Sequence, residues 1–119
     1  MKKYALVMID MQRGFIDPSS PLCIPAAAAT VPVCAEVIRL CHEKDVPVFY
    51  TTRHYRADGS DVEKCRRDVW LAGGKPLSET CEECMSDAYP EEFEVRESDY
   101  RIVKPRFSGF FGTPLDLIL

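Results

Sequence analysis

The sequence predicts an α/β domain, a three-layer sandwich in which helices cover a parallel β-sheet. Residues 4–9 form a continuous apolar run, which is typical of a strand buried on both faces. Residues 33–44 carry apolar side chains at helical spacing, and residues 46–52 are β-branched and aromatic. A strand, a helix and a strand within about fifty residues form a βαβ unit, whose two strands are parallel.

The first strand is expected at residues 4–9, in a central position of the sheet. The segment Asp-Pro-Ser-Ser-Pro at residues 17–21 has the composition of a turn and does not fit a helix. A long loop is therefore expected to follow this strand and to carry residues 10–13 at its start.

An amphipathic helix is predicted after this loop, up to about Lys44. Thr30 supplies a capping hydroxyl and Pro32 a first-turn proline. The second strand follows at residues 46–52, where Pro47 lies near the start and its missing N–H is tolerated.

The second half of the chain gives a weaker pattern. Residues 53–98 are expected to hold only loops and short helices. Residues 100–104 predict a third strand that ends at Pro105, and Thr113 with Pro114 predicts the start of a further helix. That helix has fewer than two turns and no Gly or Asn terminator. We therefore expect residues 1–119 to be the N-terminal part of one domain, truncated before its last strands and helices, with no second domain.

Composition and charge exclude several classes of protein. With 119 residues and 46% hydrophobic content, the chain is expected to form a packed core. Its net charge is −4 and no run of Lys or Arg exceeds two residues, so nucleic acid is not an expected partner. The longest uncharged window, residues 18–35, contains four prolines, so no membrane segment is expected.

The cysteines and the N-terminus bear on the cellular compartment. Six cysteines in 119 residues are too few for a small disulfide scaffold and are interpreted as reduced thiols. Only six apolar-leaning residues follow Lys3 before Asp10, which is shorter than the apolar region of a signal peptide. A cytoplasmic protein is expected.

Polar residues at the ends of the predicted strands are the first candidates for chemistry. Ligands of open parallel sheets bind outside the carboxyl ends of the strands. Asp10 follows the first strand, Arg53 and His54 follow the second, and Lys104 ends the third. A buried acid beside a lysine stays ionised and can act as a general base. The alternative is that Asp10 is a turn residue and Lys104 a solvated strand end, and the topology leaves both open.

Two motifs resemble the isochorismatase-like cysteine hydrolases. Residues 5–17 (ALVMIDMQRGFID) are similar to the opening signature of that family, and residues 104–119 (KPRFSGFFGTPLDLIL) to its second signature. The resemblance implies a Rossmann-like parallel sheet between helices and a triad of Asp, Lys and Cys. It assigns Asp10 as the base for the thiol and Lys104 as the cation that holds Asp10 ionised.

The family resemblance also implies what residues 1–119 lack. Its cysteine begins a helix after a further strand, and none of the six cysteines has that context. The expected function is hydrolysis of a small amide, ureido or enol-ether substrate, with the cysteine beyond the chain end. The alternative is a non-catalytic interaction module or an inactive remnant. The substrate is a small molecule, and a homo-oligomer or a complementing chain is compatible with the family.

The remaining candidates concern binding rather than catalysis. Nicotinamidase-type relatives hold a metal with Asp-x-His after the second strand, and Thr52-Arg53-His54 lacks that acid, so neither metal nor cofactor is expected. Arg53 either binds a substrate carboxylate or is a solvated loop residue. Phe15 either lines the substrate crevice or packs in the core. Cys81 and Cys84 form a C-x-x-C pair that is interpreted as surface or helix-face thiols, with a redox role as the alternative.

Overall fold

The computed structural model describes residues 3–119. Met1 and Lys2, which precede the apolar segment considered as a signal peptide, lie outside the described residues. Its elements, in chain order, are β1 (Leu6–Ile9), α1 (Arg13–Ile16), η1 (Ala27–Thr30), α2 (Val31–Glu43), β2 (Val48–Arg53), α3 (Arg67–Ala72), η2 (Glu83–Met85), β3 (Tyr100–Lys104) and α4 (Leu115–Ile118). The three strands and the long helix α2 thus lie where the sequence predicts them, with ends that differ by at most two residues.

The sheet is parallel throughout, in the strand order β1-β2-β3. Leu6 pairs with Val48 at the start of the first ladder, and Arg53 pairs with Lys104 at the end of the second. The predicted α/β class with a parallel sheet is therefore confirmed. Within the described residues the expectation of a central first strand is wrong, because β1 pairs only with β2, which takes the central position. An apolar run reports burial of a strand's faces, and it does not report how many strands flank it.

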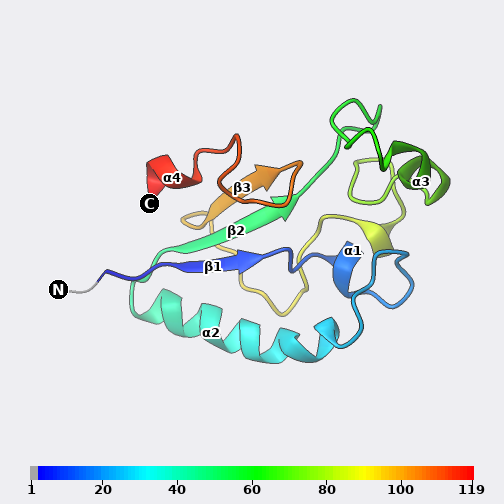
Figure 1. Cartoon of the computed structure of the whole chain (residues 1–119). Helices are drawn as coiled ribbons and strands as arrows, with labels where there is room; N and C mark the ends of the chain where they lie inside the picture. The colour runs from blue at the N-terminus through cyan, green and yellow to red at the C-terminus, as the bar shows by residue number, and fades with distance from the viewer. Residues whose placement is uncertain (1–2) are drawn as a thin grey trace.

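Helices cover the two faces of the sheet, as Figure 1 shows for α2 on one side and α4 on the other. Tyr50 of β2 packs with Ile38 of α2 in one buried cluster. Phe49 of β2 and Ile102 of β3 pack with Leu115 of α4 in another. Successive residues of β2 thus serve opposite faces, which is the alternation expected of a strand.

The long helix α2 begins where the sequence predicts, but the Thr30 side chain does not cap it. Thr30 is the N-cap residue and Pro32 lies in the first turn. The Thr30 hydroxyl donates to the carbonyl of Ala27, at 2.7 Å, and makes no capping hydrogen bond to α2. The Thr30 hydroxyl is therefore hydrogen-bonded within the 3-10 helix η1, which the sequence did not predict. Cys34 and Cys41 pack against the core as expected.

The long segments between strands contain a second, smaller core. The loop after β1 includes the single-turn helix α1, which the sequence did not predict. Of residues 53–98, Arg53 ends β2, and the rest hold loops and the short helices α3 and η2, as predicted. Tyr55, Val62, Trp70 and Leu77 form a buried cluster there, against which Phe15 packs. This cluster lies beyond the carboxyl ends of the strands, and it makes one wall of the candidate site.

The close packing of α1 against η2 depends on a glycine. A Cβ on Gly14 would lie 2.6 Å from Cδ2 of Leu77 and 3.0 Å from the carbonyl oxygen of Met85. Leu77 is buried, so it has little room to move. We expect Gly14→Ala to lower the free energy of unfolding by about 1–3 kcal/mol, measured by urea denaturation.

Gly112→Ala provides a comparison without crowding. No atom lies within 4 Å of a Cβ placed there, although its φ of 65° disfavours a side chain. Equal unfolding midpoints for Gly14→Ala and the wild type would contradict the assigned contact.

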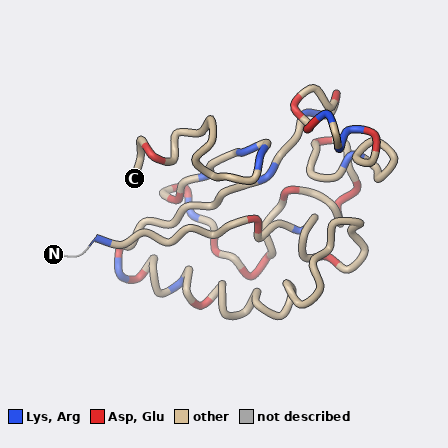
Figure 2. The backbone as a smooth tube through the Cα atoms, in the orientation of Figure 1, with Lys and Arg blue, Asp and Glu red and all other residues tan. Residues whose placement is uncertain are grey.

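Charged residues of both signs are interspersed over the backbone, as Figure 2 shows. Basic and acidic residues alternate most densely around α3 and the loop before it. In the part of the chain that the structure describes, no helix is long and apolar enough to cross a bilayer.

Candidate active site

Asp10 follows the last residue of β1 and adopts a left-handed backbone conformation, with a φ of 56°. Its N–H donates to the carbonyl of Thr51 at 3.2 Å. An extended strand would carry Asp10 to the same face as Met8, under α2. The left-handed turn breaks this alternation, and aspartate tolerates it better than most residues do. Strained conformations of this kind are common where a functional group is aimed at a site.

Lys104 is the last residue of β3, and its side chain is 1% exposed. Its Nζ lies 3.1 Å from Oδ1 of Asp10 and donates to the carbonyl of Phe107 at 2.6 Å. The structure therefore brings together the two residues that the sequence singles out, and Lys104 is not a solvated strand end. Their strands are not neighbours, because β2 lies between them, and the ion pair bridges across the end of β2.

A cavity of about 570 Å³ opens beside this ion pair. It is lined by Asp10, Phe15, Pro21, Leu22, Ile24, Arg53, Tyr55, Val62, Glu63, Cys65, Arg66, Val69, Trp70, Gly73, Pro76, Leu77 and Phe107. Asp10, Phe15 and Arg53, which the sequence places near one crevice, share this lining. Phe15 both lines the cavity and packs against the smaller core, and its contact with a substrate stays a prediction.

Arg53 is 4% exposed, so the interpretation as a solvated loop residue is wrong. One of its guanidinium nitrogens lies 2.6 Å from Oε1 of Glu63 and also donates to the hydroxyl of Tyr55. The guanidinium is thus already paired with an internal carboxylate. It holds the loop before α3 against the end of β2, on the border of the cavity.

His54 turns away from the cavity. Its Nδ1 lies 2.8 Å from a carboxylate oxygen of Asp87, which also pairs with Arg101. His54 does not line the cavity, so the expectation that an imidazole joins the carboxylate and the ammonium there is wrong. Adjacent residues at a strand end point in opposite directions, and Arg53 occupies the inward one.

Gln12 is a positioning residue that the sequence analysis did not identify. Its side chain is fully buried, and its Nε2 donates to the carbonyl of Arg53 at 2.7 Å. The N–H of Arg53 in turn donates to Oε1 of Gln12 at 2.8 Å. The amide side chain thereby replaces a strand residue and fixes the loop that carries Asp10. Gln12 belongs to the motif of residues 5–17, but its partner Arg53 lies 41 positions away and no local pattern indicates this contact.

The pairing of Arg53 with Glu63 predicts a pH dependence of stability. Burial raises the pKa of Glu63, but hydrogen bonds from its own backbone and from Tyr55, with the charge of Arg53, outweigh it, so the pKa lies below its ordinary value. A carboxylate with a depressed pKa in the folded state stabilises the fold above its ordinary pKa of 4.5. This stabilisation is lost as the pH falls below about 4.5, through the folded-state pKa.

We therefore expect Glu63→Gln to reduce stability at pH 7 and to leave it little changed at pH 3, as measured by urea denaturation across this range. The exposed Glu91 is a matched control, because its replacement by glutamine removes the same charge from the surface. An equal pH dependence of the wild type and Glu63→Gln would contradict the role of the pair.

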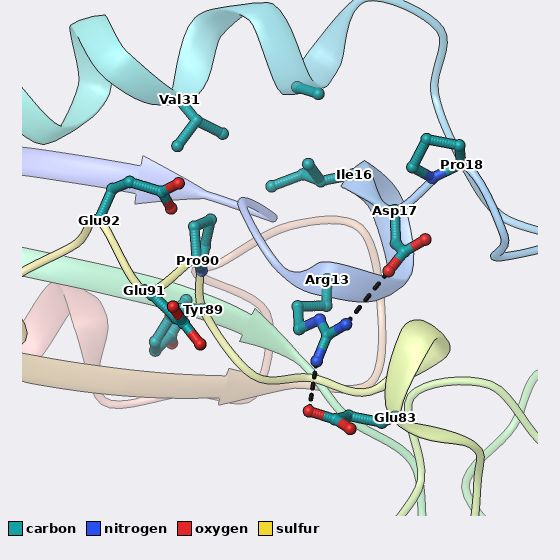
Figure 3. A pocket seen from close by; sticks show the side chains of 11 residues that line it. Arg13, Ile16, Asp17, Pro18, Val31, Glu83, Tyr89, Pro90, Glu91 and Glu92 are labelled. Atoms are coloured by element: carbon teal, nitrogen blue, oxygen red, sulfur yellow. Dashed lines mark hydrogen bonds and ion pairs between the residues drawn. The ribbon is translucent and has the colours of Figure 1, made fainter.

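A second hollow, of about 520 Å³, lies between α1 and the segment before β3, and neither Asp10 nor Lys104 lines it. Figure 3 shows Arg13 at its floor, pointing toward Asp17 on one side and Glu83 on the other. These ion pairs measure 3.2 and 2.6 Å. The hydrogen bonds to Asp17 and Glu83 raise the pKa of Arg13. Because both partners are carboxylates, the positive charge of Arg13 is already compensated. The cavity beside Asp10 is the better candidate site.

Metal ligands and thiols complete the description of the site. Within residues 3–119 no three His, Cys, Asp or Glu side chains are grouped so that they could hold a metal ion. All six cysteines are free. Cys81 is partly buried and its Sγ donates to the carbonyl of Ser78 at 3.0 Å, whereas Cys65 is exposed at the edge of the cavity.

Comparisons with known proteins identify the family of this chain. The model of the isochorismatase domain family matches residues 4–119. A probable inactive nicotinamidase from Arabidopsis thaliana is 32% identical over 117 residues, which cover 97% of this chain and 58% of that protein. N-carbamoylsarcosine amidase from an Arthrobacter species is 30% identical, over 97% of this chain and 43% of the amidase.

The fold is also found among solved structures. The crystal structure of an isochorismatase family protein from Desulfovibrio vulgaris superposes with a TM-score of 0.84 and 36% identity. The match covers 97% of this chain and 59% of that one. The chain therefore spans about half the length of the relatives that it matches.

Proposed function

Because this chain belongs to the isochorismatase family, we propose that it forms the part of a cysteine hydrolase that supplies the acid and the lysine of an Asp-Lys-Cys triad. The substrate is a small amide, with ureido and enol-ether compounds as related candidates. One observation carries this proposal: the ion pair of Asp10 and Lys104 stands at 3.1 Å beside a cavity large enough for a small molecule.

Each residue of the pair has a defined task. The Asp10 carboxylate takes the proton of a thiol, and the thiolate attacks the amide carbonyl carbon. The C–N bond breaks, the amine leaves with a proton returned from Asp10, and an acyl-thiol remains for hydrolysis by water. The Lys104 ammonium pairs with the Asp10 carboxylate and stabilises negative charge that develops near it.

The thiol comes from outside residues 1–119 in this proposal. Cys34 and Cys41 pack against the core beneath the sheet. The thiol of Cys81 donates a hydrogen bond to the backbone carbonyl of Ser78. Cys65 is the one cysteine among the cavity-lining residues, and it lies exposed at the rim of the smaller core. The length of the relatives supports a further segment that carries the nucleophile.

The test combines mass and turnover on the protein purified from its natural source. An intact mass clearly above 13.5 kDa, with release of ammonia from a panel of small amides, is the expected result. Cys65→Ser should leave turnover unchanged. A folded protein that hydrolyses no amide, or one whose turnover depends on Cys65, would refute the proposed mechanism.

A non-catalytic role is the second candidate function. It is favoured by one observation, the name of the Arabidopsis relative as a probable inactive nicotinamidase. In that case Asp10 and Lys104 form a structural ion pair. This alternative would be supported by a folded protein that shows no amide turnover and that loses stability when the Asp10–Lys104 pair is broken.

A further inference from the structure

Most charged side chains at the cavity form ion pairs, and one arginine does not. Asp10 is paired with Lys104, and Glu63 with Arg53. Arg66 also lines the cavity, and among residues 3–119 its guanidinium has no carboxylate partner. Among the described charged residues that line the cavity, Arg66 is therefore the one without an oppositely charged partner.

Arg66 is exposed, and its guanidinium lies over the exposed aromatic ring of Phe107. Its central carbon lies 4.9 Å from the ring centroid of Phe107, and that of Arg53 lies 4.9 Å from the same centroid. Cations are attracted to aromatic faces at this distance. The carbonyl of Phe107 also accepts the hydrogen bond from Lys104. Phe107 thus connects the uncompensated cation to the residue that pairs with Asp10.

A second feature points to an anionic ligand. The Nε of Arg53 is buried and makes no hydrogen bond within the described residues. An unsatisfied buried donor is costly unless a bound group completes it. Arg53 and Arg66 both contact the ring of Phe107, and both line the cavity.

The rest of the cavity wall is mainly apolar. Phe15, Val62, Trp70 and Leu77 contribute hydrocarbon and aromatic surface to it. Such walls favour an apolar or aromatic body and disfavour further charges. The cavity volume is within the usual range of roughly 300–1,000 Å³ for small-molecule sites.

We propose that Arg66 is a specificity-determining residue, which selects an amide with an apolar body and one anionic group at the end remote from the amide. The amide carbonyl then lies at Asp10 and the anion at Arg66, with the body against Trp70. This proposal rests on the proposed function insofar as the cavity is taken as the substrate site of the hydrolase.

Binding measurements test the proposal without requiring a nucleophile. The probes are 4-carbamoylbenzoate, which carries an amide and a carboxylate, and the neutral terephthalamide of the same shape. Their dissociation constants are measured by NMR titration for the full-length protein, which is the form used in the turnover test. We expect the anion to bind about five- to tenfold more tightly than the neutral probe, because a guanidinium–carboxylate contact is charge-assisted. The preference should decrease as the salt concentration rises.

Three variants identify Arg66 as the source of the preference. Arg66→Gln should reduce the ratio of the two constants to about one and leave the neutral probe's affinity unchanged, and Arg66→Lys should restore part of the ratio. Arg56→Gln is the matched control, because Arg56 is exposed on the same loop, is paired with Asp58 and does not line the cavity.

The outcomes separate this proposal from the proposed function. A ratio of one in the wild type, or a ratio that persists in Arg66→Gln, would overturn the role of Arg66. Anion preference without any amide turnover in the protein from its natural source would retain the binding site and refute the hydrolase. Amide turnover without a preference for the anionic probe would support the hydrolase and refute the role of Arg66.

Discussion

Replacing Asp10 with asparagine is expected to reduce amide turnover by roughly 10²- to 10⁴-fold and to lower the free energy of unfolding by about 3–5 kcal/mol. The loss of activity follows because an amide side chain cannot accept the thiol proton. The loss of stability follows because Lys104, which is 1% exposed, loses its carboxylate partner and keeps only the carbonyl of Phe107 as an acceptor. Turnover is measured as ammonia release, and stability by urea denaturation.

The exposure of the two partners makes the stability prediction asymmetric. The Asp10 side chain is 30% exposed, so water can solvate its carboxylate when Lys104 is replaced by methionine. Lys104→Met is therefore expected to destabilise the fold less than Asp10→Asn does. The double variant Asp10→Asn/Lys104→Met should be more stable than Asp10→Asn alone, since no buried charge then lacks a partner. Additive losses in this cycle would show that the two side chains do not interact as the structure indicates.

The sequence predicted the parts of the fold that depend on local patterns. Three local patterns indicate which side chains are buried: the apolar run before Asp10, the helical spacing of α2 and the β-branched run of β2. Each pattern depends only on residues that are close together in the sequence. The same logic located Asp10 and Lys104, because polar residues that end buried strands lie at one edge of a parallel sheet. Their roles in catalysis stay predictions.

What the sequence did not predict depends on contacts between distant segments. The strand order that places β2 between β1 and β3 leaves no trace in the strands themselves. The direction of His54 is set by Asp87, which lies 33 positions further along the chain. The wall around Trp70 belongs to a segment with no clear periodicity, so its place beside Asp10 emerged only from the structure.

Gln12→Met is expected to lower the free energy of unfolding by roughly 2–5 kcal/mol, which is a large effect for a residue without a proposed chemical role. Methionine fills a similar volume but leaves the N–H and the carbonyl of Arg53 buried without partners, each at a cost of about 1–3 kcal/mol. The measurement is urea denaturation, together with hydrogen exchange at the Arg53 amide, which should accelerate.

Gln12→Glu separates the two hydrogen bonds of this side chain. An ionised glutamate still accepts from the N–H of Arg53 but has no proton to donate to its carbonyl, so this variant is expected to be destabilised at pH 7. A protonated glutamate regains the donor, and burial favours that neutral form. The stability difference from the wild type should therefore shrink as the pH falls toward about 4, near the ordinary pKa of glutamate. A constant difference across this range would mean that the Gln12 side chain fixes the Asp10 loop by packing and not by donating to Arg53.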